Sequence, residues 1–420
     1  MGNLRTVFGV AVAVLGHVGF GLGTSLGSSS GTSLKPKVAQ TAQQAVGVLP
    51  QSEHTAPTIG FFEGANVALK TFGSGSAVQL MESQPAGIVL ILGKIDPESI
   101  PEKVEPGLSF SNLSIHGFRS KRYRVEVDDV IARVISAFSC TYVKELALEN
   151  FGLRELQNIP GQQIALAKTQ SLKLSNISNL YFDWFCAVLR MNSGQVEPIT
   201  LSVHDCTVEY LAPLDNLGIG ELSGIRLSYL PNLHTIDLKL PLKSAPKMIL
   251  ELHNLNKWCK IDKKLVKFIA SMHWDSVWIE MSHWNMIYKL TKNNLEVKSF
   301  LHFYVTEWED MSLCGQYKEH LILKTPEIVF QDSTSHLFLE KQFLDNAIQW
   351  VYFSNIETTK VRIYHCDKAP TPELIDYLQK ISIDSERATS LKSFKVLSQE
   401  LSFFKLSDIT RNSRTICAIS

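Results

Sequence analysis

The sequence predicts an α/β fold in which similar strand-and-helix units stack side by side as a solenoid. The first observation is a short run of alternating apolar residues, whose successive copies between Leu146 and Ile328 start 24 to 29 residues apart. The second is that stretches between these runs have helical patterns. A period in the twenties accommodates one strand and one helix per unit. Such an array forms one continuous body, instead of the two or three domains that 420 residues could otherwise supply.

Each unit begins with two apolar residues separated by one residue, followed by a spacer, often Asn, Asp or His, and then an apolar residue or Cys. Alternating apolar residues predict a strand with one buried face. The clearest copies are 146–151 (LALENF), 172–177 (LKLSNI), 201–206 (LSVHDC) and 250–255 (LELHNL). Further copies start at Leu108, Ile225, Val277, Ile328 and Val361, with looser ones near Leu301 and Phe394.

Three of the intervening stretches carry helix signals. Residues 179–191 are mostly apolar and are followed by Asn192-Ser193-Gly194, which suits a helix end. Residues 261–273 form a lysine-rich amphipathic pattern. Thr371-Pro372-Glu373 places a capping hydroxyl, a first-turn proline and an acidic residue before 374–381. We therefore expect each unit to run strand, then helix.

With these units in place, the chain resembles the leucine-rich repeat family over roughly residues 108–400. The family consensus is L-x-x-L-x-L-x-x-N/C, and residues 143–151 and 222–230 fit its apolar positions. The resemblance implies a curved solenoid with parallel strands on the concave face, helices on the convex face and a protein partner on the concave face. Secreted, degenerate proteins of this type resemble those of microsporidian parasites.

The chain also departs from that consensus. Where the unit contains asparagine, it stands one residue before the consensus position. Cys206 and Cys366 do occupy that position, but they lie about 25 Å apart at the usual strand spacing, so we expect two buried, unpaired thiols. Gaps of 38 residues before Leu146 and 33 on either side of Val361 indicate insertions or a missed unit, for which 351–356 is a competing strand. An ordinary pair of α/β domains remains the alternative fold.

The amino-terminal end predicts secretion. Residues 1–23 carry one basic residue, Arg5, and then an apolar run, as a signal peptide does, and the run is short for a membrane span. We expect a polar linker at 24–57, a capping region at 58–107, the repeats at 108–410 and a tail at 411–420. Asn112 and Asn176 lie in N-x-S sequons and would be glycosylated in a secreted chain.

Both ends of the chain also support a competing localisation. Met1-Gly2 begins an M-G-x-x-x-T myristoylation pattern, and the terminal Cys417-Ala-Ile-Ser matches a prenylation signal. Together, acylation at Gly2 and prenylation at Cys417 would describe a lipidated, membrane-associated cytoplasmic adaptor. Both modifications are cytosolic, so this reading and secretion exclude each other, and we favour secretion.

The alternation of each strand names the surface on which a partner would bind. Residues between the buried ones must point to the opposite, inner face. Aromatic and arginine side chains there are typical of binding hot spots. An alternative is that Trp278 and Tyr304 only cover hydrophobic neighbours, and a one-residue slip to Phe300 would reverse one row. The predicted binding residues are Trp278, Glu280, His302, Tyr304, Arg362 and Tyr364.

Charge and motifs argue against several other functions. The 41 basic and 41 acidic residues leave no net charge to attract nucleic acid. The seven cysteines include no C-x-x-C pair. Glu280-x-x-His283 with His273 is the best metal trio, yet we interpret the Glu280 and His283 pair as solvated. His204 with Asp205 has no evident nucleophile. The sequence therefore predicts a non-enzymatic protein-binding protein that needs no metal or cofactor.

Overall fold

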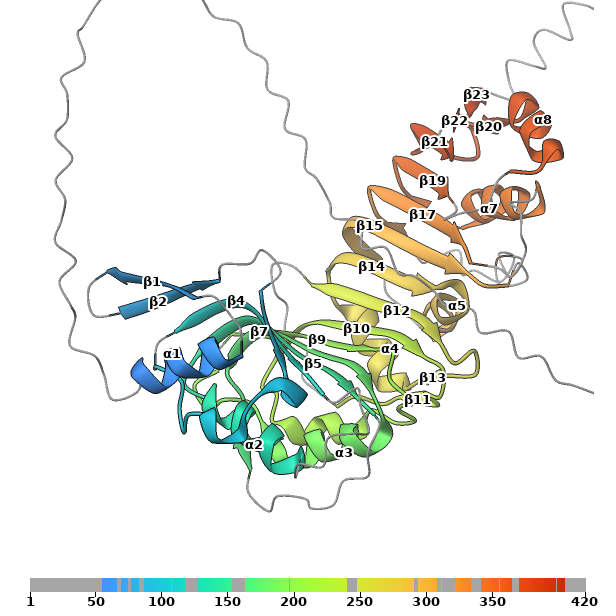
Figure 1. Cartoon of the computed structure of the whole chain (residues 1–420). Coiled ribbons are helices and arrows are strands. Elements are labelled where there is room, and N and C mark those ends of the chain that lie inside the picture. Colours follow the sequence, from blue (N-terminus) through green and yellow to red (C-terminus); the bar gives the residue numbers. More distant parts are fainter. Residues whose placement is uncertain are drawn as a thin grey trace, which may run out of the picture. The chain divides into compact units, whose positions relative to one another are not determined.

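In the computed structural model, strands that follow one another in sequence lie next to one another in a large, mostly parallel sheet of 15 strands (Figure 1). The structure describes residues 55–65, 69–74, 77–82, 87–106, 108–117, 127–152, 163–195, 197–239, 248–290, 294–307, 311, 322–333, 341–354, 356–364, 370–397 and 399–404. The main strands are β3 (Ile88–Ile91), β4 (Ser109–His116), β5 (Tyr142–Phe151), β7 (Lys168–Ile177), β9 (Ile199–His204), β10 (Leu222–Leu230), β12 (Ile249–Leu255), β14 (Trp274–Glu280), β15 (Leu295–Val305), β17 (Glu327–Asp332), β19 (Lys360–Tyr364), β21 (Ser393–Val396) and an antiparallel β22 (Gln399–Glu400).

The predicted strand register is confirmed from Leu146 onward. The first apolar residues of the units pair with one another across the sheet, and each of them is at most 2% exposed. Leu301 is buried and pairs with Val277, so the strand has not slipped to Phe300. This buried row consists of Leu146, Leu172, Leu201, Ile225, Leu250, Val277, Leu301, Ile328, Val361 and Phe394.

The start of the sheet differs from the prediction. Leu113, not Leu108, pairs with Leu146, which makes this gap 33 residues, as long as those around Val361. Strand β3, from the region expected to form a cap, pairs with β4 and extends the sheet by one more strand. The 33-residue gaps on either side of Val361 are insertions, because β17, β19 and β21 pair consecutively. The competing strand at 351–356 is wrong, since its first half, residues 351–353, forms the end of helix α7 (Lys341–Phe353).

Helices occupy many of the gaps between strands. The three predicted helices are confirmed as α3 (Asn179–Val188), α4 (Lys263–Ser271) and α8 (Pro372–Lys380), and the Oγ1 of Thr371 accepts a hydrogen bond of 3.1 Å from the Leu374 amide. The other helices in the described part of the chain are α1 (Thr55–Gly64), α2 (Val127–Ala137), α5 (Met281–Leu290), α7 and the 3-10 helices η1 (Leu92–Lys94), η2 (Pro97–Ser99) and η3 (Ala212–Leu217).

The expectation that every unit contains an α-helix is wrong. Only the 3-10 helix η3 follows β9, and the described residues between β10 and β12 hold the short strand β11 (Thr235–Ile236) and no helix. Short parallel strand pairs also lie between the main strands, several of them in the same segment as a helix: β11 with β13 (Lys260–Ile261), β6 (Ile164–Ala165) with β8 (Leu189–Arg190), β16 (Leu323–Lys324) with β18 (Ile356–Glu357) and β20 (Ser382–Asp384) with β23 (Ser402–Phe404). The antiparallel pair of β1 (Leu69–Ser74) and β2 (Ala77–Glu82) is separate.

The helices cover one face of the sheet (Figure 1). Aromatic contacts carry this packing: the ring of Phe151 lies 4.9 Å from Phe185 of α3, Phe303 lies 5.3 Å from Trp284 of α5, and Phe330 lies 5.4 Å from Trp350 of α7. These strand residues belong to the buried, inward-pointing set, so the core lies between the sheet and the helices. The outward-pointing residues of the strands therefore form the other face.

Candidate binding face

We call the outward-pointing surface of the sheet the open face. Its residues form two columns that cross the strands, as the register predicted. Side chains in a column stand about 4.8 Å from their neighbours, close enough for direct contact. By register, the columns are Ser114, Ala147, Lys173, Ser202, Arg226, Glu251, Trp278, His302, Val329 and Arg362, and His116, Glu149, Ser175, His204, Ser228, His253, Glu280, Tyr304 and Gln331. Glu280 has a place in the register, but its side chain is buried.

Near the carboxyl ends of five successive main strands, one residue has a left-handed backbone conformation. The φ angle is positive at Asn150 (63°), Asn176 (52°), Asp205 (51°), Tyr229 (55°) and Asn254 (52°). Asparagine and aspartate tolerate this conformation better than other non-glycine residues. The asparagines that stood one residue before the family's consensus position therefore have a backbone role of their own.

The left-handed residue also reverses the alternation of its strand. Two residues after a buried Leu148, Asn150 would otherwise point into the core, but it is half-buried and the next residue, Phe151, is 2% exposed. Ile177, Cys206, Leu230 and Leu255 return to the core in the same way, at 8% exposure or less. In each of these strands, the left-handed residue therefore points outward and the residue after it is buried in the hydrophobic core.

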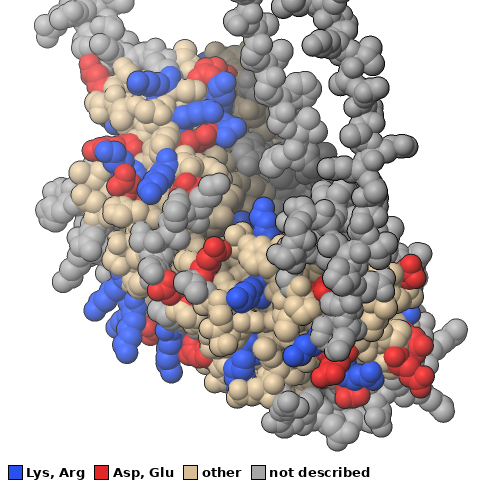
Figure 2. All heavy atoms as spheres, turned by 90° about the vertical axis from the view of Figure 1, so that its left-hand side faces the viewer, with Lys and Arg blue, Asp and Glu red and all other residues tan. Residues whose placement is uncertain are grey.

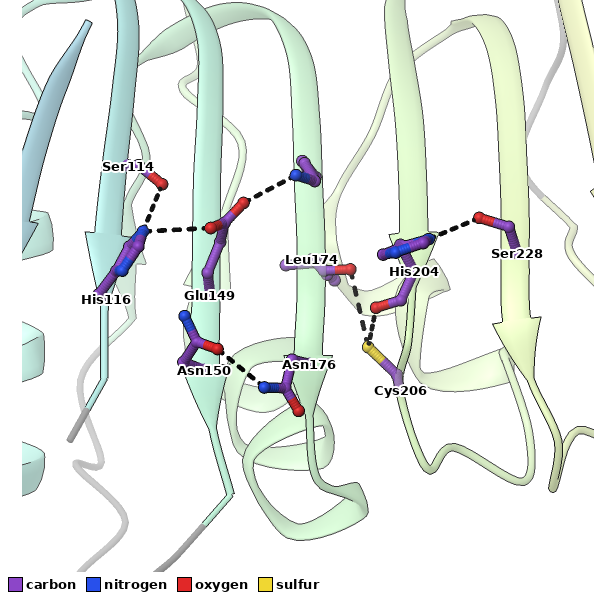
Figure 3. Close-up of polar contacts among 10 residues, drawn as sticks. Ser114, His116, Glu149, Asn150, Leu174, Asn176, His204, Cys206 and Ser228 are labelled. Carbon is purple, nitrogen blue, oxygen red and sulfur yellow. Dashed lines mark hydrogen bonds and ion pairs between the residues drawn. The ribbon is translucent and has the colours of Figure 1, made fainter. Parts of the chain in front are cut away.

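The first part of the open face carries a charged network, drawn in Figure 3. The Nε2 of His116 lies 3.1 Å from Glu149 Oε2, and the Lys173 Nζ lies 2.8 Å from Glu149 Oε1. The hydrogen bond from His116, with the hydrogen bond and charge of Lys173, outweighs burial and lowers the pKa of Glu149 to about 2. Glu149 is thus a carboxylate throughout the physiological range.

Histidine and tyrosine rings follow on the next strands. The Nδ1 of His204 lies 2.8 Å from the Ser228 hydroxyl (Figure 3), and its ring packs edge-on against Tyr229 at 5.0 Å. The Tyr229 ring in turn lies 5.6 Å from His253. Burial, followed by the charge of Lys173, lowers the pKa of His204. The His204 ring is therefore held in its neutral form at neutral pH.

The row of ring contacts continues from His253 on β12 to Tyr304 on β15, two strands further on. The rings of His253 and Tyr304 stack at 4.5 Å, and those of Tyr304 and His302 stack at 4.6 Å. His302 Nε2 lies 3.0 Å from Gln331 Oε1, and burial lowers the pKa of His302 to about 4. We call His204, Tyr229, His253, Tyr304 and His302 the ring ladder.

Glu280 lies between the two halves of this stack, and its side chain turns away from solvent. Its Oε1 accepts a hydrogen bond of 3.1 Å from the Leu255 amide, and its Oε2 lies 3.2 Å from His283 Nδ1. Both side chains are at most 4% exposed. The interpretation of Glu280 and His283 as a solvated pair is therefore wrong. Glu280, the last residue of β14, thus links this strand to His283 of α5. Because its side chain does not lie on the open face, His253 and Tyr304 from the flanking strands stack on each other there.

The structure brings three of the predicted binding residues together. Trp278 pairs in register with His302, packs edge-on against Phe300 at 4.7 Å and is half-buried, as is Tyr304. Arg362 stands two strands further on, forms an ion pair with Glu327 and is half-buried. Tyr364 pairs with Gln331 through its backbone, and its side chain lies outside the described residues. Sequence reasoning missed Tyr229, which points outward only because of its left-handed backbone.

Other predicted positions have mixed placements. Asn176 is exposed, and its Nδ2 donates a hydrogen bond of 2.8 Å to Asn150 Oδ1 (Figure 3). Asn112, in β4, is half-buried. Cys206 is a buried free thiol, as expected, and burial raises its pKa to about 12. Gly2, Cys366 and Cys417 lie outside the described residues.

His204 also has a neighbour that the sequence did not indicate. The expectation that His204 has no nucleophile beside it is wrong, because the Ser228 Oγ lies 2.8 Å from its Nδ1. Ser228 is only 5% exposed, however, so its side chain offers little access to a substrate carbonyl. This hydrogen bond orients the His204 ring on the face.

Charge on the visible surface is mixed. Figure 2 shows acidic and basic side chains interspersed over much of one face, with a group of basic side chains near its lower left edge. Within the described residues, no group of three or more His, Cys, Asp or Glu side chains could hold a metal ion, and no helix is long and apolar enough to cross a bilayer. Comparisons with protein-family models, curated proteins and solved structures found no match to this chain.

Proposed function

We propose that this protein is a secreted, non-enzymatic solenoid of degenerate leucine-rich repeats that binds a protein partner on its open face. The ring ladder is the observation that carries the proposal. Five aromatic or imidazole rings on strands β9 to β15 contact one another in sequence, beside the half-buried Trp278. Tyrosine and tryptophan supply large contact areas with a polar group, as hot-spot residues do.

Tyr229 gives the proposal further support. It is 48% exposed and has a φ of 55°, where an asparagine or glycine would be less strained. Four other units use Asn or Asp at the equivalent position. Strain at an exposed residue does not help the fold, so it favours a role in recognition.

The solenoid part of the proposal rests on the strand order and on the repeated register. Each main parallel strand bonds to the main strands before and after it in sequence, and the first apolar residue of each unit lies in the buried row. Arrays of this kind offer an extended face to which several units contribute. A protein surface of the usual interface size, about 800 Å² per partner, could span many of these strands.

The test of the binding face is affinity capture from the native extracellular fluid with tagged full-length chain, compared between variants by quantitative mass spectrometry. Trp278→Ala and Tyr304→Ala should each weaken capture of the same partner about tenfold or more. Phe353→Ala, which removes a 60% exposed ring from α7 on the helix-covered side, is the matched control and should capture normally. Equal capture by all three variants, or a collapse of thermal stability in the first two, would refute the binding role.

Secretion is tested separately by the mass and amino-terminal sequence of the native protein. A mature chain that begins near Thr24, with glycan on Asn112 or Asn176, supports the proposal. An intact, acylated Gly2 and a prenylated Cys417 would instead support the lipidated cytoplasmic adaptor, for which the two terminal motifs are the motivating observation.

A further inference from the structure

A second surface, outside the open face, concentrates positive charge around an exposed tryptophan. Within 257–267 the chain has five lysines and one acidic residue, Asp262, although the whole chain has equal numbers of acidic and basic residues. All five lysines are exposed, and Trp258 is 75% exposed, the highest value among the large hydrophobic residues that the structure describes. We call Lys257, Trp258, Lys260, Lys263, Lys264 and Lys267 the lysine–tryptophan patch.

The turn after β12 holds Trp258 outward. The Asn256 side chain accepts a hydrogen bond of 2.9 Å from the Trp258 amide, and its carbonyl accepts one of 2.8 Å from the Cys259 amide. Cys259 and Ile261 are buried, at 1% and 4% exposure, which anchors the segment on both sides of Lys260. Trp258 therefore stands out from a fixed turn and does not lie over the core.

Helix α4 extends the patch. Its N-cap, Asp262, accepts hydrogen bonds from the Lys264 and Leu265 amides. Lys263, Lys264 and Lys267 lie on its exposed side, while its buried residues are Leu265, Val266, Ile269 and Ala270. Spacings of three and four residues put Lys267 on the same side as the other two. One surface thus combines the turn, β13 and the first turns of α4.

The fold itself gains little from this arrangement of charge. Lysines in the first turn of a helix oppose the positive end of the helix dipole, and like charges three and four residues apart repel one another. Among the described residues, Lys260, Lys263, Lys264 and Lys267 have no ion pair, and Lys257 has only Glu307, at 3.8 Å. Their common location is explained better by an external anionic partner.

We propose that the lysine–tryptophan patch binds the surface of an anionic phospholipid bilayer. Lysines beside an anionic membrane are each attracted to it, and tryptophan partitions into the region between headgroups and acyl chains. A side chain that is three-quarters exposed projects towards a flat surface instead of lining a groove. The Lys257 Nζ lies 5.0 Å from the Trp258 ring centre, so one ring face already has a cation near it, which disfavours stacking of a nucleic-acid base there.

This membrane contact is independent of the proposed protein-binding function. Helix α4 packs on the helix-covered side, where its Ile269 carbonyl accepts a hydrogen bond of 2.9 Å from the buried Trp274 ring. The open face lies on the other side of the sheet. A chain attached to lipid through the patch would keep the ring ladder available, so either proposal can fail without the other.

The test is co-sedimentation of the full-length chain with phosphatidylcholine vesicles, with or without roughly 30% phosphatidylserine. We expect binding only to the anionic vesicles and a strong loss at high salt. Because each lysine near an anionic surface adds about 1 kcal/mol, or about fivefold in affinity, Lys263→Gln/Lys264→Gln/Lys267→Gln should weaken binding by about a hundredfold. Trp258→Ala should weaken it by several fold while leaving its salt dependence unchanged.

Two controls make the result decisive. Lys94→Gln/Lys103→Gln/Lys144→Gln removes the same charge from exposed lysines outside the patch and should bind as the wild type does. The patch variants should melt at or above the wild-type temperature, because their lysines do not stabilise α4. Equal loss in both triple variants, no binding to anionic vesicles, or binding to a single-stranded oligonucleotide in place of vesicles would each overturn the proposal.

Discussion

The side-chain amide of Asn176 donates a hydrogen bond of 2.8 Å to the side-chain oxygen of Asn150 on the neighbouring strand. Both residues have positive φ angles and both follow the second buried leucine of their unit by two positions. The bond therefore joins two backbone reversals, each of which returns the next residue to the core. This relationship explains why the repeated pattern places asparagine where the leucine-rich consensus has none.

The first prediction concerns the backbone requirement at Asn176. Asn176→Val should lower the free energy of unfolding by about 2 kcal/mol, because a branched side chain is strained at positive φ and the bond to Asn150 is lost. Asn176→Gly should cost less, since glycine adopts the conformation freely. Denaturant unfolding of both variants provides the measurement. Equal losses for the two would show that the hydrogen bond, and not the backbone, is what matters.

The second prediction concerns Tyr229, which has the same backbone conformation without a suitable side chain. Tyr229→Asn should raise the free energy of unfolding by about 0.5 to 1 kcal/mol, because it relieves strain at positive φ. The same variant should bind the open-face partner less tightly. Tyr210→Asn is the control: Tyr210 is 53% exposed and is not among the residues with positive φ, so no gain in stability is expected.

The third prediction is the acid sensitivity of the charged network. The pKa of Glu149 falls from 4.5 to about 2 in the folded chain, so its contribution to stability is present above pH 4.5 and is lost as the pH falls through 2. Glu149→Gln should therefore cost about 1 to 2 kcal/mol at pH 7, and that cost should shrink below pH 4.5. Glu145→Gln, at an exposed position on the same strand, should cost little at any pH. Unfolding curves across this range test both variants.

The fourth prediction concerns His302 in the ring ladder. Burial lowers its pKa from 6.5 to about 4, so the unfolded chain takes up a proton more readily than the folded chain between these values. Stability associated with neutral His302 is present above pH 6.5 and is lost as the pH falls through 4. His302→Gln should flatten the fall in unfolding free energy over this window by up to about 3 kcal/mol. His273→Gln, at a 64% exposed side chain, should leave the slope unchanged.

The sequence predicted the strands well because their signal is local. Alternating apolar residues and a near-constant spacing were enough to place the buried row from Leu146 to Phe394 in register. Before Leu113 the local pattern is ambiguous: β3 is an uninterrupted apolar run (IVLI) without alternation, and Leu108-Ser-Phe110 alternates in the same way as Leu113-Ser-Ile115, so the pattern does not reveal β3 and does not separate Leu108 from Leu113. A helix was expected in each unit, but propensity does not reveal where a short strand or a 3-10 turn connects two strands instead.

The site was harder to predict because it depends on side-chain direction. Strict alternation correctly brought Trp278, His302 and Tyr304 together, but it assigned Glu280 to the open face. The burial of Glu280 follows from two partners, the Leu255 amide and His283, which are visible only once β12, β14 and α5 are assembled. Tyr229 was missed for the opposite reason, since its outward position depends on a φ angle that the residue type does not suggest.

The order of the main strands has a consequence for how the molecule unfolds. Since each of these strands bonds to partners that adjoin it in sequence, few of the sheet's contacts require distant segments of chain to meet. Damage to one unit should then loosen its immediate neighbours and spread outward, instead of dissolving the whole sheet in a single step. Amide hydrogen exchange would show this as a gradient of protection along the array, highest in its middle units and falling towards β3 and β21.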